Sequence, residues 1–200
     1  MAVPEYDETS LRAALGRMAP WQRMTFAAAC AERLYLAYVR YVAESGRGEP
    51  QTVRSALDRV WEAAERDRGV RDSDALVGRL TLLVPDSDVD EWSQWADYGE
   101  DAVAATIHAL NATHSADPAS ARAAAHRCIA AVDSAAQVRL DATFDAGDLI
   151  RLREDEFVQA ELARQARDLE DLGAISAHDP KLVEQVRTRS RIDTATLLGL

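Results

Sequence analysis

The stretch that decides the fold is PWQRMTFAAACAERLYLAYVRYVAE, residues 20–44. Pro20 suits the first turn of a helix, where its missing N–H is not needed, and Ser45-Gly46-Arg47-Gly48 ends the periodic pattern. Apolar residues recur at helical spacing along two stripes. One stripe holds Trp21, Met24, Ala28, Tyr35, Tyr38 and Val42, and the other holds Phe26, Cys30, Leu34 and Tyr41. Because a helix that is apolar over much of its circumference is typical of a bundle centre, we expect this helix to be central.

The segments on either side also have helical periodicity, and none alternates convincingly as a strand. We expect further helices over about 10–17, from Pro50, from Asp72 or Ser73 to Val84-Pro85, around 103–111, from Pro118, over about 149–172 and from Pro180. In the 149–172 helix, Glu154-Asp155-Glu156 is interpreted as a solvated face. The sequence therefore predicts an all-α, single-domain bundle of about seven to eight helices over residues 1–200.

The acidic charge is unevenly distributed along the chain. The 23 basic and 34 acidic residues give a formal net charge of −11. Residues 1–79 carry 12 of each sign, residues 80–121 carry 8 acidic and no basic residues, and residues 122–200 carry 14 acidic and 11 basic residues. Such an excess argues against binding to nucleic acid or to anionic membranes, because both depend on Lys and Arg. We expect neither partner.

No targeting or redox signal stands out. The chain has no run of 18 apolar residues and begins without the basic and apolar regions of a signal peptide, so we expect a cytoplasmic protein. Cys30 and Cys128 are the only cysteines. Free cysteine in Ala-rich helices usually behaves as a small hydrophobic residue, although a disulfide between these two remains an alternative.

The acidic connection 86–101 is the candidate metal site. Asp86, Asp88 and Asp90 occupy positions 1, 3 and 5 of a calcium-loop pattern, and Asp97 occupies position 12. Glu91 stands at position 6, where the loop requires glycine for a sharp turn. The alternative interpretation, helix caps followed by a solvated face, is favoured. The common phosphate, zinc, di-iron and hydrolase motifs are absent from the sequence, so we predict no catalytic residue, metal or cofactor.

A polar constellation accompanies the aromatic stripe of the central helix. It comprises Trp21, Gln22, Thr25, Phe26, Glu32, Arg33 and Tyr35. One interpretation is a buried Glu32–Arg interaction that fixes helix packing. The other is a polar pocket lined by Trp21, Glu32, Arg33 and Tyr35.

These residues also carry a resemblance to a known family. WQRMTFAAACAERLYLAYVRY (21–41) resembles the opening motif of the YjaG-like bacterial family, domain of unknown function 416. RSALDRVWEA (54–63), VPDSDVDEW (84–92) and AVAATIHAL (102–110) resemble its following segments, and the resemblance covers about residues 20–195. Leu36 and Ala31 stand where the family often has proline and cysteine. The resemblance implies an all-helical, cytosolic bacterial protein with no assigned reaction.

Three functions follow as hypotheses. The leading one is a non-enzymatic interaction or regulatory protein, with an unknown protein partner or a second copy of the chain. The second is an immunity- or antitoxin-type inhibitor that meets a basic partner through Asp86, Asp88, Asp90 and Glu91, since complementary charge speeds such encounters. The third is a small-molecule binder or unassigned enzyme that uses the Trp21/Glu32/Arg33/Tyr35 region.

Overall fold

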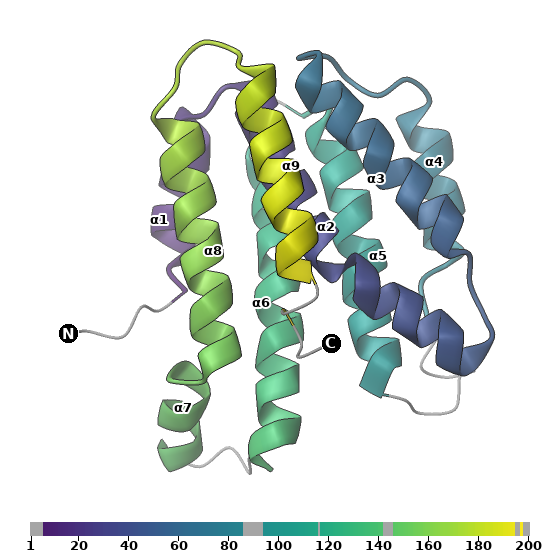
Figure 1. Ribbon diagram of the computed structural model, residues 1–200, viewed down its shortest axis with the longest axis vertical. Helices are drawn as coiled ribbons and strands as arrows, with labels where there is room; N and C mark the ends of the chain where they lie inside the picture. The colour runs from purple at the N-terminus through teal and green to yellow at the C-terminus, as the bar shows by residue number, and fades with distance from the viewer. Residues whose placement is uncertain (1–5, 86–93, 116, 142–145, 195–196, 198–200) are drawn as a thin grey trace.

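The described part of the chain is built from helices that pack around one of their number. This computed structural model describes residues 6–85, 94–115, 117–141, 146–194 and 197. Within these ranges it has nine helices (Figure 1). They are α1 (Glu8–Arg17), α2 (Pro20–Ser45), α3 (Pro50–Glu65), α4 (Ser73–Thr81), α5 (Gln94–Ala112), α6 (Ala119–Leu140), α7 (Ala146–Arg153), α8 (Glu156–Gly173) and α9 (Pro180–Thr194). The prediction of an all-α bundle is confirmed.

Helix α2 is the centre of the bundle, as its two apolar stripes predict. It packs against α3, α5, α6, α8 and α9, and every residue from 21 to 34 is buried. Neighbouring helices come close because small residues face one another. The Ala-rich helix α6 buries Ala121, Ala124, Ala125, Ala131 and Ala136. The Sγ of Cys128 in α6 lies 3.0 Å from the backbone oxygen of Cys30 in α2.

The expected helix over 149–172 is two helices, which raises the count from seven or eight to nine. Asp155 has an extended backbone, with φ −60° and ψ 135°, and it caps the N-terminus of α8. Its Oδ1 accepts hydrogen bonds from the backbone N–H groups of Phe157 at 2.9 Å and Val158 at 3.4 Å. An aspartate cap supplies acceptors for N–H groups that have no partner within the helix. The acidic triplet is therefore a helix start and not the solvated face of one long helix.

Helix α5 begins nearer the N-terminus than its apolar pattern indicates. The helix includes Trp95 and Tyr98, whose rings contact edge to face at 5.6 Å, and the guanidinium of Arg40 in α2 lies over the Trp95 ring at 5.6 Å. These aromatic contacts hold the first turns of α5 against the bundle, so part of the expected acidic connection is helical. Over the described ranges, no helix is long and apolar enough to cross a membrane.

Candidate functional site

The constellation on α2 begins with Gln22, which joins the start of one helix to the end of another. Its Oε1 accepts a hydrogen bond from the backbone N–H of Ala19 at 2.5 Å, at the N-terminus of α2. Its Nε2 donates to the backbone oxygens of Leu172 and, at 2.7 Å, Ile175, where α8 ends. One buried amide thus satisfies polar groups that both helix ends would otherwise leave unpaired.

The neighbouring residues Trp21, Thr25 and Phe26 are packing residues in this structure. Trp21 is buried and contacts the His178 ring edge to face at 5.4 Å. The Thr25 hydroxyl donates to the backbone oxygen of Trp21 at 2.7 Å, within the same helix. Phe26 is completely buried. These three side chains therefore fill the interior between α2 and the segments around it.

Glu32 is a buried carboxylate that receives four hydrogen bonds. Arg54 of α3 donates to Oε1 at 2.6 Å and to Oε2 at 2.9 Å. The indole N–H of Trp61 donates at 2.8 Å, and the Nε of Arg191 in α9 donates at 3.3 Å. Although burial alone would lower the pKa of Arg54, its hydrogen bonds and charge interaction with Glu32 raise it above the ordinary value. Glu32 therefore joins α2 to α3 and α9 through a charged, hydrogen-bonded group.

Arg33 is fully buried and pairs with two carboxylates of α8. Its Nη2 lies 2.9 Å from Oε1 of Glu161, and its Nη1 lies 2.8 Å from Oδ2 of Asp168. Burial alone would lower the pKa of Arg33, but these carboxylates raise it well above the usual range. Asp168 also accepts from Arg189 of α9 at 2.6 Å. The ion pair therefore continues from α2 through α8 to α9.

Tyr35, the last member of the constellation, lies nearer the surface. Its hydroxyl donates to the backbone oxygen of Pro50 at 3.3 Å, and the Arg54 guanidinium lies over its ring at 5.0 Å. Burial raises its pKa above the ordinary value. Trp21, Glu32 and Arg33 are at most 2% exposed. All three lie on α2 and contact residues of the surrounding segments, which favours the interpretation of a packing interaction over an open polar pocket.

Cys30 and Cys128 are both free and buried. They lie near the same ion-pair network, because Arg33 Nη2 is 3.5 Å from the Sγ of Cys30. Burial raises the pKa of the Cys128 thiol well above its ordinary value. The structure therefore places both residues as small packing groups of the α2–α6 contact and not as a disulfide.

The acidic connection is only partly described. Asp86, Asp88, Asp90 and Glu91 lie outside the described residues, so the metal and partner hypotheses for them stay predictions. Asp97 is exposed. Among the residues that the structure describes, no three His, Cys, Asp or Glu side chains gather in a way that could hold a metal ion.

The described carboxylates that follow Asp97 are partly neutralised by another helix. Arg127 of α6 lies 3.0 Å from Oδ1 of Asp101 and 3.4 Å from Oε1 of Glu100. Burial raises the pKa of Asp101 to about 6, although Arg127 opposes this shift. The stretch that has no basic residue of its own therefore receives positive charge from tertiary contact.

Two surface hollows contain residues that the sequence did not single out. One lies between α6, α7 and α8, has a volume of about 340 Å³, and is lined by Tyr6, Ile129, Asp133, Leu149, Leu152, Arg153, Val158 and Leu162. The other, of about 550 Å³, follows α3 and the loop after it, and five arginines line it. The sequence signal for the second was the run ERDRGVR, residues 65–71. The equal numbers of acidic and basic residues over 1–79 concealed it.

Comparisons with known proteins agree on one family. A family model described as "Protein of unknown function (DUF416)" matches residues 10–200. The uncharacterized protein YjaG of Escherichia coli (strain K12) is 30% identical over 74 residues, which are 37% of this chain and 38% of that protein. The match thus spans well under half of that relative. The crystal structure of a DUF416 family protein from Shewanella baltica OS155 has a TM-score of 0.82 at 19% identity and covers 92% of this chain and 93% of that chain. At that identity, the likeness shows a shared fold.

Proposed function

The chain belongs to the DUF416 family, whose function is unknown, and from this premise we propose that it is a non-enzymatic interaction or regulatory protein of the bacterial cytoplasm. The charged residues of the motif that resembles the family support this proposal. Glu32 and Arg33 are engaged in buried ion pairs between helices. Such pairs fix how helices are arranged, so recognition would fall to the exterior of the bundle.

The observation that carries the proposal is the apolar hollow between α6, α7 and α8. Its lining includes Leu149, Leu152 and Leu162. Leu149 is 51% exposed and the adjacent Ile150 is 58% exposed. Helix α7 lies at the end of the molecule where α6 finishes (Figure 1), and Val138, near the end of α6, is also exposed. Exposed apolar side chains beside an apolar hollow are typical of protein–protein contacts, in which one inserted side chain supplies much of the binding energy.

The occupant that we propose is an apolar side chain of another protein, either a second copy of this chain or a different partner. The Ala-rich face of α6 is not available for this role, because its buried alanines pack within the chain. The exposed side chains of α7 would therefore provide the surface instead.

The test replaces the exposed apolar side chains by charged ones. Leu149→Glu/Ile150→Glu is compared with the control Leu82→Glu/Ile192→Glu, which alters two apolar residues elsewhere that are even more exposed. Light scattering on size-exclusion fractions measures the mass of each variant, and crosslinking in the native bacterium identifies the proteins captured by each. We expect the α7 variant alone to lose either the dimer or a crosslinked protein. A monomeric wild type with the same crosslinked proteins for both variants would contradict the proposal.

A further inference from the structure

The arginine side chains of this chain differ in whether they have a partner, and most of the unpartnered ones gather in one place. All 22 arginines lie in the described ranges. Of these, five have side chains that make no hydrogen bond, ion pair or ring contact with any described residue: Arg12, Arg17, Arg59, Arg68 and Arg71. Three of the five, Arg59, Arg68 and Arg71, line the hollow of about 550 Å³ along α3. Although the chain has a net charge of −11, these clustered cations have no carboxylate partner and would attract an anion.

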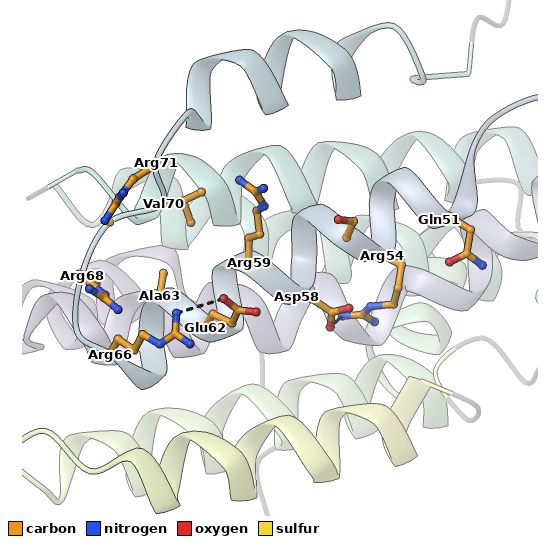
Figure 2. Close-up of a pocket in the computed structure, with 12 residues that line it drawn as sticks. Gln51, Arg54, Asp58, Arg59, Glu62, Ala63, Arg66, Arg68, Val70 and Arg71 are labelled. Atoms are coloured by element: carbon orange, nitrogen blue, oxygen red, sulfur yellow. Dashed lines mark hydrogen bonds and ion pairs between the residues drawn. The ribbon is translucent and has the colours of Figure 1, made fainter.

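The hollow combines one face of α3 with the loop 66–71. Figure 2 shows Arg68 and Arg71 in the loop beyond the end of α3, and Arg59 pointing from α3 toward the side on which Arg71 lies. Arg54 and Arg66 complete the five arginines of the lining, and Asp58 and Glu62 are its two carboxylates. The lining therefore has a net charge of +3. Asp67 in this loop and Asp72 directly after it do not line the hollow.

The two carboxylates of the lining are already engaged by other arginines. Glu62 pairs with Arg66 at 3.3 Å. Asp58 pairs with Arg54 at 3.0 Å and with Arg187 and Arg191 of α9 at 2.8 and 3.3 Å. Neither carboxylate neutralises Arg59, Arg68 or Arg71. These three guanidinium groups therefore remain available to an anion from solution.

The loop that carries Arg68 and Arg71 is held by the turn that follows α5, which contains Thr113 and His114. Nε2 of His114 lies 2.6 Å from the backbone oxygen of Val70, and the backbone N–H of Val70 donates to the Thr113 hydroxyl at 3.4 Å. Gly69 approaches this turn so closely that an added Cβ would lie 2.6 Å from the His114 ring and 3.0 Å from the backbone oxygen of Thr113. A loop fixed in this way presents its arginines without a large ordering cost on binding.

We propose that this hollow binds a small molecule that carries two or more phosphate groups. Arginine presents a planar set of donors that matches phosphate oxygens two at a time, and several arginines can hold a short phosphate chain. The volume of about 550 Å³ is within the range of small-molecule sites. A long nucleic acid would extend beyond the hollow over a chain of net charge −11, which repels it. This site is separate from the α6–α8 hollow and does not depend on the function proposed there.

The experiment titrates the full chain calorimetrically with tripolyphosphate and, separately, with ATP, both without metal and at low salt. The variant Arg68→Gln/Arg71→Gln is compared with Arg12→Gln/Arg17→Gln, which removes the same charge from two unpartnered arginines outside the hollow. We expect saturable binding by the wild type and the control, and binding at least about tenfold weaker by the loop variant. Circular dichroism checks that all variants fold, and Arg59→Gln gives a second, independent loss of affinity.

The two ligands distinguish the source of the phosphate groups. Equal affinity for tripolyphosphate and ATP means that the phosphate chain alone is recognised, and tighter binding of ATP means that the hollow also contacts a nucleoside. Absence of saturable binding of both ligands to the wild type would overturn the proposal. The proposal would also be overturned if Arg12→Gln/Arg17→Gln lost as much affinity as Arg68→Gln/Arg71→Gln, because the ligand would then be held by nonspecific charge attraction.

Discussion

Glu32 and Arg33 are adjacent in the sequence, but their side chains pair with different helices. Glu32 accepts from Arg54 of α3 and Arg191 of α9, whereas Arg33 donates to Glu161 and Asp168 of α8. Successive side chains of an α-helix point about 100° apart, since 3.6 residues make one turn. The Glu32-Arg33 dipeptide of α2 can therefore join three surrounding helices, α3, α8 and α9.

Replacing Arg33 should strongly destabilise the fold. Arg33→Met leaves Glu161 without its main cation in the interior, and breaking a buried ion pair from one side costs about 3–5 kcal/mol. Arg33→Met/Glu161→Gln should recover part of that loss, because the uncompensated charge is then absent. Urea denaturation measures the free energy of unfolding of each variant. The exposed Arg12→Met is the control, and an equal effect of Arg12→Met and Arg33→Met would contradict this role.

Asp101 should make stability depend on pH. Burial raises its pKa from 3.8 to about 6 in the folded protein. Between these values the folded state keeps a proton that the unfolded state has lost, so this stabilising contribution is complete below about pH 4 and is lost as the pH rises through 6. We expect the free energy of unfolding of the wild type, relative to Asp101→Asn, to fall by about 3 kcal/mol from pH 4 to pH 7. Urea denaturation across this window measures it, and a constant difference would refute the assignment.

Two glycines should respond to alanine in opposite directions. In Gly69→Ala the new Cβ meets the His114 ring and the Thr113 backbone oxygen, so we expect a loss of about 1–3 kcal/mol from overpacking. In Gly78→Ala the Cβ has no atom within 4 Å, and the substitution in α4 should stabilise by about 0.5–1 kcal/mol. Thermal unfolding of both variants shows whether each substitution raises or lowers the stability relative to the wild type. Stabilisation by Gly69→Ala would mean that the loop does not approach the turn after α5 as described.

The two cysteines should be unreactive in the folded protein. Both are buried and free, and burial raises the pKa of the Cys128 thiol, so little nucleophilic thiolate forms there. A thiol reagent such as DTNB should label neither residue in native buffer and both residues in guanidinium chloride. Labelling of one cysteine before unfolding would show that the α2–α6 contact opens locally.

Local pattern was sufficient for the helices but not for the point at which one helix becomes two. Periodicity over 149–172 is compatible with a continuous helix, and the sequence gives no distance between Asp155 and the N–H groups that it caps. The same acidic triplet can be a solvated face or a helix start. Only the backbone of Asp155, extended at ψ 135°, distinguishes the two.

By itself, the sequence determined the all-α class, the central position of the 20–44 helix and the DUF416 family, because helical periodicity and a contiguous motif are local properties. The tertiary structure decided which charges meet. Arg191 reaches Glu32 across 159 positions of the chain, and Arg127 reaches the carboxylates of α5. Although residues 1–79 carry equal numbers of acidic and basic side chains, the fold brings Arg59, Arg68 and Arg71 together on one surface. Net charge adds over residues wherever they lie, whereas electrostatic attraction depends on the distance between them, and that distance is fixed only by the fold.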